Sequence, residues 1–236
     1  MAFATPGLCH AQADSLIIAP IKRHSFLTQS IIPTTLIGAG ILINRTRFEK
    51  TVNKETEGLF RKDFHTTADD YMRYAPIAEM YIADLAGVKA KNHWFDQTKN
   101  LAISVVVTDF IVHQIKKATQ KTRPNGAELA HSFPSAHSAL AFTNATVLFE
   151  EFRDSSPLLA YSGYGFATAT GTLRLLNNAH WMSDVLMGAG IGILVTKVVY
   201  LLDPIIAWNP FKNKSDIVIL PQIDNQSYGL YFCKRF

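Results

Sequence analysis

The strongest constraint on the fold is an uninterrupted apolar stretch near the N-terminus. Residues 26–43 (FLTQSIIPTTLIGAGILI) contain no charged side chain, and Lys22, Arg23 and His24 precede them closely. As a helix rising about 1.5 Å per residue, this stretch is about 27 Å long, close to the roughly 30 Å thickness of the hydrocarbon core of a bilayer. The sequence therefore predicts a membrane-spanning helix here.

Apolar segments that follow along the chain predict a helical bundle. They are residues 74–88, 101–115, 137–149, 158–176 and 185–202. Small residues recur in the last two, including Gly188 and Gly192, and this spacing lets helices pack closely. We therefore expect an all-α fold, a bundle of six transmembrane helices. The shorter runs also fit buried helices, so a soluble all-α protein is the alternative.

Three acidic side chains lie inside these apolar segments: Glu79, Asp84 and Asp109. A carboxylate that faces lipid costs roughly 2.5–3.5 kcal/mol on insertion scales. We therefore expect these residues to face the interior of the bundle or to lie near its ends.

The organisation of the chain follows from where its polarity changes. Residues 1–24 are expected to be a leader or a partial signal segment, residues 25–204 the membrane-embedded domain, and residues 205–236 a polar tail. Two strand-like runs around Asp224 predict a small terminal hairpin. The polar region 45–73 predicts a surface connection, with an amphipathic helix at the interface.

Composition excludes several classes of function. The chain has 236 residues with a net charge of +4, and it contains no basic run of the kind that follows nucleic acid. Its two cysteines lack the spacing of a zinc site or of a disulfide framework. We expect no nucleic-acid partner, no metal and no other cofactor.

Polar clusters at the edges of the apolar segments carry the candidate chemistry. They are KKATQKTRP (residues 116–124), SFPSAHS (132–138) and RLLNNAHWMSD (174–184). If consecutive helices alternate in direction, all three clusters fall on the same side of the bundle. A single site can therefore gather them.

The first property of such a site is affinity for phosphate. Lys116, Arg123 and Arg174 provide cations, and the guanidinium fork of arginine grips phosphate oxygens in pairs. Ser135 and Ala136 lie where a helix is predicted to begin, so their backbone N–H groups and the positive helix end add an anion site. We predict that these five residues bind phosphate.

The second property is reactivity. His180 and Asp184 are one helical turn apart, so the carboxylate can hold the proton of one ring nitrogen while the other nitrogen attacks. His137 has no carboxylate at helical spacing and suits protonation of the leaving oxygen. We predict His180 as nucleophile, His137 as acid and a phosphohistidine intermediate, with cations taking the place of a metal.

The three clusters together resemble the type 2 phosphatidic acid phosphatase superfamily. Its signature is Lys-x6-Arg-Pro, Pro-Ser-Gly-His and Ser-Arg-x5-His-x3-Asp, and the match covers roughly residues 100–202. The resemblance implies the helical fold shared with haloperoxidases, a six-helix core, a site at one membrane face, and a lipid-phosphate substrate. It also implies the residue roles given above. Ala136 replaces the usual Gly and Leu173 the usual Ser, and neither change removes a charged group.

The identity of the lipid stays open at this level. The Asn-Asn-Ala-His-Trp stretch resembles bacterial members, notably those of the Bacteroidetes, among which lipid A phosphatases occur. Undecaprenyl diphosphate, phosphatidylglycerol phosphate and phosphatidic acid are alternatives. A soluble acid phosphatase, a vanadate haloperoxidase and a non-catalytic protein that binds lipid headgroups are the competing functions. A cytoplasmic N-terminus followed by six spans would place the site at the periplasmic face of a bacterial inner membrane.

Overall fold

The structure is a computed structural model that describes residues 26–59, 64–127, 131–206, 209, 217–224 and 227–234. The predicted leader at residues 1–24 lies outside the described residues.

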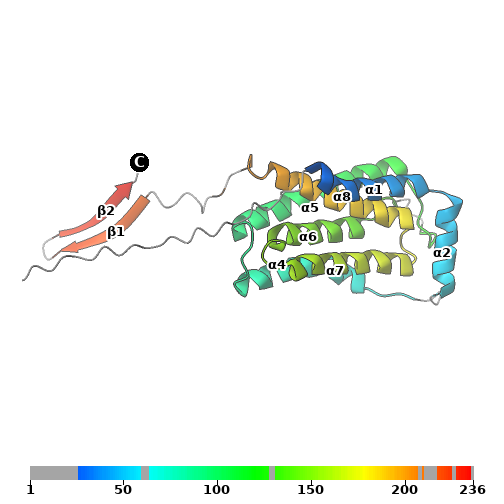
Figure 1. The fold of residues 1–236 in the computed structure, drawn as a ribbon, viewed down its shortest axis with the longest axis horizontal. Helices are drawn as coiled ribbons and strands as arrows, with labels where there is room; N and C mark the ends of the chain where they lie inside the picture. Colours follow the sequence, from blue (N-terminus) through cyan, green and yellow to red (C-terminus); the bar gives the residue numbers. More distant parts are fainter. Residues whose placement is uncertain are drawn as a thin grey trace, which may run out of the picture.

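The described helices form a bundle that a further helix crosses at one end. Most of the helices lie side by side along the long axis of the bundle, and α2 runs across one end (Figure 1). Each predicted apolar segment coincides largely with one of α1 and α4 to α8, so the all-α prediction is confirmed. The helices are α1 (Phe26–Ile43), α2 (Arg47–Leu59), α3 (Ala68–Met72), α4 (Ala75–Leu85), α5 (Trp94–Thr119), α6 (Ala136–Phe152), α7 (Pro157–Leu176) and α8 (Met182–Leu202).

Near the C-terminus the backbone forms the predicted hairpin. Strands β1 (Ile217–Asp224) and β2 (Ser227–Lys234) pair antiparallel, with Asp224 opposite Ser227.

Helices α6 and α8 approach each other closely because of the glycines of α8. A Cβ atom at Gly188 would lie 2.5 Å from the main-chain oxygen of Ser135, and one at Gly192 would collide with the main-chain oxygen of Ala139. Real Cβ atoms do not come so near, so only glycine allows this backbone contact. The predicted close packing at these glycines is confirmed, and it fixes the first residues of α6 against α8.

The surface and the interior of the bundle differ in the way expected of helices in lipid. Two of the described helices, α1 and α8, are long and apolar enough to cross a bilayer. Between helices, buried polar side chains bond to one another, for example Lys197 Nζ to Glu150 Oε1 at 2.6 Å. Large apolar side chains are exposed instead, and patches of this kind mark membrane or partner contacts. They include Leu27, Ile31, Ile32, Ile41, Leu42, Val106, Phe110, Leu158, Leu201 and Leu202.

Two of the three acidic residues that were predicted to avoid lipid have partners inside the bundle. Glu79 and Asp84 accept hydrogen bonds from side chains of α7 and α5. For Asp109 the prediction is wrong, because its side chain is 64% exposed and lies near the middle of α5. Its partner is His113 on the same outer face, with Nδ1 3.3 Å from the Asp109 carboxylate.

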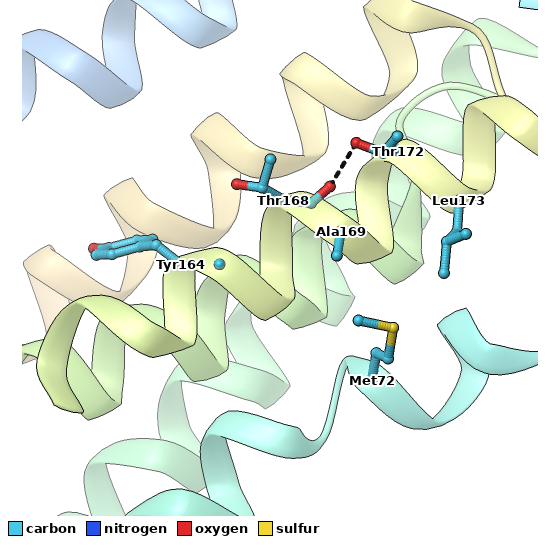
Figure 2. A pocket seen from close by; sticks show the side chains of 7 residues that line it. Met72, Tyr164, Thr168, Ala169, Thr172 and Leu173 are labelled. Carbon is cyan, nitrogen blue, oxygen red and sulfur yellow. Dashed lines mark hydrogen bonds between the residues drawn. The ribbon is translucent and has the colours of Figure 1, made fainter. Parts of the chain in front are cut away.

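The segment predicted as the second apolar helix is shorter than expected. Helix α4 has 11 residues, or about 16 Å, which is too short to cross a hydrocarbon core of about 30 Å. The five-residue α3 precedes it directly, and both pack along α6 and α7. Figure 2 shows α3, which carries Met72, beside α7.

Candidate active site

The three polar clusters meet at the end of the bundle that α2 crosses (Figure 1). Main-chain hydrogen bonds join the segments that carry them: Ser135 donates to the oxygen of Asp184 at 2.9 Å, and Ser132 donates to the oxygen of Lys121 at 2.9 Å. The end of α5, the start of α6 and the junction of α7 and α8 are therefore neighbours, as alternating helix directions require.

His180 and Asp184 form a buried pair. Nδ1 of His180 lies 3.4 Å from Oδ2 of Asp184, and the two side chains are 2% and 0% exposed. The same Oδ2 accepts hydrogen bonds from the backbone N–H of Trp181 at 3.0 Å and from the hydroxyl of Ser132. Because the carboxylate holds the proton on Nδ1, the lone pair is on Nε2, which has no partner among the described residues.

Burial keeps this imidazole neutral. It lowers the pKa of His180 from 6.5 to about 4, against the opposing effect of Asp184. The positive charges of Lys116 and Arg174 lower the pKa further. At neutral pH the ring is therefore an uncharged base with a free lone pair, which is the form that a nucleophile needs.

The lowered pKa of His180 predicts that its ring stays neutral in mildly acidic solution. Its imidazole ¹³C and ¹⁵N shifts in the detergent-solubilised protein should not change between about pH 8 and about pH 5, because the protonated form gains population only near pH 4. After unfolding in denaturant, the same ring should titrate near pH 6.5. A midpoint near pH 6.5 in the folded protein would contradict the burial argument.

The predicted cations influence one another electrostatically. Burial lowers the pKa of the Arg123 guanidinium, and the charge of Arg174 lowers it further. Lys116 donates to the main-chain oxygen of His131 at 2.5 Å. Arg123 forms no ion pair within the part of the chain that the structure describes. Since like charges at close range disfavour one another, a bound anion would relieve the repulsion between these groups.

Helix α3 holds one side of Arg174. Nη1 of Arg174 pairs with Oδ2 of the fully buried Asp69 at 2.5 Å, and Asn177 donates to the other oxygen of Asp69 at 3.2 Å. The buried Nε of Arg174 has no acceptor among the described residues. The guanidinium is therefore oriented by α3 and keeps one buried donor for a ligand.

The start of α6 offers further donors. Ser135 is the N-cap residue, and its hydroxyl accepts from the backbone N–H and the hydroxyl of Ser138 at 3.3 and 3.0 Å. The N–H groups of Ala136 and His137 have no acceptor among the described residues. Ala136 has no positive φ, so the alanine in place of glycine brings no backbone strain. The helix start that was predicted as an anion site thus presents free N–H groups at Ala136 and His137.

A carboxylate from outside the motifs contacts His137. Nε2 of His137 lies 2.7 Å from Oδ1 of Asp70 in α3, and Asp70 is about half exposed. The sequence has no carboxylate at helical spacing from His137, and the region 45–73 was predicted to be a surface connection. The pairs Asp70–His137 and Asp69–Arg174 join residues 67 and 105 positions apart. No local spacing can reveal them.

Two residues of α3 and His137 of α6 form the one cluster of potential metal ligands among the described residues. The ligand atoms of Asp69, Asp70 and His137 lie within 4.8 Å of one another. Asp69 is paired with Arg174 and Asp70 with His137, so these contacts are ion pairs and hydrogen bonds within the chain.

A shallow, mostly apolar groove runs along α7 beside α3 (Figure 2). Its volume is about 800 Å³, and Leu173, next to Arg174 in sequence, lies at one end of its lining. The hydroxyl of Thr172 donates a hydrogen bond to the main-chain oxygen of Thr168 at 2.9 Å, so it does not add an unpaired donor to the groove. Leu173 stands where the superfamily that the motifs resemble has serine, and it contributes apolar surface to the groove. The lining is Met72, Tyr164, Gly165, Thr168, Ala169, Thr172 and Leu173.

Comparison with known proteins finds relatives in sequence and in fold. Residues 97–206 match the model of the PAP2 superfamily. A lipid A 1-phosphatase of Porphyromonas gingivalis is 34% identical over 148 residues, which make up 62% of this chain and 33% of that protein. The chain therefore spans about a third of the length of this relative.

Two solved structures share the fold at low sequence identity. LpxE of Aquifex aeolicus superposes with a TM-score of 0.50 at 19% identity, over 67% of this chain and 98% of the other. A transmembrane PAP2 type phosphatidylglycerolphosphate phosphatase of Bacillus subtilis superposes with a TM-score of 0.52 at 16% identity, over 77% and 99%.

Proposed function

Because residues 97–206 match the model of the PAP2 superfamily, we propose that this protein is an integral-membrane phosphatase that hydrolyses a phosphate ester or diphosphate of a lipid. The observation that carries the proposal is the buried His180–Asp184 pair, with its free Nε2, at the end of the bundle where the cationic and helix-start clusters meet. The 34% identity to a lipid A 1-phosphatase supports the same chemistry.

The bundle is embedded in a bilayer, with its apolar side chains facing lipid. Six crossings result if α3 and α4 together form the second one, since residues 68–85 would cover about 27 Å as one helical segment. The others are α1 and α5 to α8. With a cytoplasmic N-terminus, the site lies at the periplasmic face of a bacterial inner membrane.

The first chemical step transfers the phosphoryl group to His180. Nε2 attacks phosphorus, the bond from phosphorus to the lipid oxygen breaks, and His137 gives its proton to that oxygen. Asp70 stabilises the protonated imidazole of His137 through their 2.7 Å contact. The product is a phosphohistidine and a lipid alcohol, or a lipid monophosphate if the substrate is a diphosphate.

The second step returns the site to its starting state. Water attacks the phosphohistidine, its proton passes to His137, and the bond from phosphorus to Nε2 breaks. In both steps Lys116, Arg123 and Arg174, with the N–H groups at the start of α6, stabilise the charge on the three equatorial oxygens. These cations and donors allow the reaction without a metal.

Lipid A is the first substrate to test. The relative of 34% identity is a lipid A 1-phosphatase, and the apolar groove that ends at Leu173 offers a surface for an acyl chain next to Arg174. Undecaprenyl diphosphate, phosphatidylglycerol phosphate and phosphatidic acid are the alternative substrates.

The test is phosphate release by the purified, detergent-solubilised protein from each of these lipids. The proposal expects release from at least one of them, and mass spectrometry of membrane lipids from cells with and without the protein should show the same lipid losing a phosphate. Release from a soluble phosphomonoester alone, by protein extracted without detergent, would favour a soluble acid phosphatase. Binding of the lipids without any release would favour a non-catalytic headgroup-binding protein.

A further inference from the structure

A buried lysine lies behind the catalytic carboxylate, on the side away from His180. Nζ of Lys121 is 3.0 Å from Oδ1 of Asp184 and 2.8 Å from Oε1 of Glu49 in α2. It is also 2.8 Å from the hydroxyl of Ser183. The side chain of Lys121 is 5% exposed and that of Glu49 is 2% exposed. Lys121 lies between Lys116 and Arg123 of the first motif. Neither Lys121 nor Glu49 was predicted to belong to the site.

The two oxygens of Asp184 serve different neighbours. Oδ2 faces His180 and accepts from the N–H of Trp181, while Oδ1 accepts from Lys121 and lies 3.3 Å from the hydroxyl of Ser183. A carboxylate that is bonded at both oxygens has one orientation available to it. Lys121 therefore helps to decide which oxygen faces the nucleophile.

Glu49 fixes Lys121 in turn. Its Oε1 also accepts from the backbone N–H of Ser183 at 3.3 Å and from the hydroxyl of Ser183, and its Oε2 accepts from the N–H of Arg45 at 2.8 Å. An ammonium group this deeply buried needs such pairing, because burial of an unpaired charge costs several kcal/mol. The chain of contacts links α2 to the catalytic pair.

We propose that Lys121, held by Glu49, is a positioning residue that locks the carboxylate of Asp184 against Nδ1 of His180. The inference rests on the proposed phosphatase function and adds to it two residues that do not touch the substrate. It assigns the region 45–73 a role in catalysis through α2.

The test compares Lys121→Met with Lys117→Met, which changes an exposed lysine of α5 that forms no ion pair with a described carboxylate. We expect kcat of Lys121→Met to fall roughly 10- to 100-fold, as for other residues that orient catalytic ligands, with little change in KM. The control should keep the wild-type values. Thermal unfolding and gel filtration in detergent show whether each variant is folded.

The pH profile separates positioning from a merely structural role. The charged groups that act on His180 are Asp184, Lys116 and Arg174. Without Lys121, the charge of Asp184 is less compensated and stabilises the protonated ring of His180 more strongly. The pKa of His180 then rises, so the acid limb of the kcat/KM profile, where activity falls on acidification, should move up by about one pH unit. Lys121→Arg keeps the charge and should keep the limb. A structural defect would lower the active fraction and leave the limb in place.

Glu49→Gln tests the proposal even if Lys121→Met does not fold, because it retains the pair of Lys121 with Asp184. It should lower kcat without moving the acid limb upward, since it removes a negative charge. A folded Lys121→Met variant with wild-type kcat and limb would overturn the inference, and so would Glu49→Gln with unchanged kcat. A wild-type protein that releases phosphate from none of the lipids would refute the proposed function and this inference with it.

Discussion

Replacement of His180 by alanine or glutamine is expected to lower the rate of phosphate release from the lipid substrate by about 10³-fold or more. The free Nε2 is the atom proposed to bond to phosphorus, and loss of a nucleophile removes the whole covalent route. Substrate binding should change little, because the cations and the helix start remain. The measurement is single-turnover phosphate release at saturating lipid, together with lipid binding to the same variant.

The chain contains a matched control for this substitution. His113 and Asp109 are four residues apart in the sequence, as His180 and Asp184 are, and Nδ1 of His113 lies 3.3 Å from the Asp109 carboxylate. This pair, however, is exposed on the outer face of α5. His113→Ala should retain wild-type activity. If His180→Ala keeps more than about a tenth of the wild-type rate while binding lipid normally, another group is the nucleophile.

Gly188→Ala is expected to reduce both activity and stability, although the residue touches no substrate. The added Cβ would lie 2.5 Å from the main-chain oxygen of Ser135 and 3.1 Å from the backbone nitrogen of Ala139. The start of α6, with His137, must then move away from α8, which carries Asp184. A displacement of about 1 Å at a catalytic group can cost about 10²-fold in rate, and overpacking of this kind typically costs about 1–3 kcal/mol.

Gly38→Ala is the control for the glycine substitution. Gly38 lies within α1, and no atom beyond its local backbone lies within 4 Å of a Cβ built there. Alanine is the better helix former, so this variant should be as stable as the wild type or slightly more stable. Thermal midpoints in detergent and kcat are measured for both variants. If Gly188→Ala had the same thermal midpoint and the same kcat as the control and the wild type, α6 and α8 would not need their close contact.

The sequence predicts the helical fold well because apolar length and polarity changes are local properties. Residues 26–43 were predicted as one helix, and α1 has these bounds. The three motifs were expected at one end of the bundle, and the hydrogen bond from Ser135 to Asp184 brings two of them together there. The break between α3 and α4 was not predicted, since hydropathy does not show where a helix is interrupted by a turn.

The remaining parts of the site depend on contacts that sequence spacing does not encode. Asp70 and Glu49 come from the polar region before α4, and only the packed fold brings them to His137 and Lys121. Ser135 was predicted to bind phosphate through a backbone N–H, whereas this N–H donates to the main-chain oxygen of Asp184 and the hydroxyl of Ser135 is engaged at the cap of α6. Its role in phosphate binding stays a prediction.

The most direct test of the account is a structure of the protein with orthovanadate, which imitates a phosphoryl group with five ligands. The account predicts vanadium bonded to Nε2 of His180, with His137 near the opposite apical oxygen and the three cations around the equatorial oxygens. Vanadate bound elsewhere, or His137 and His180 facing away from the same vanadium atom, would contradict it.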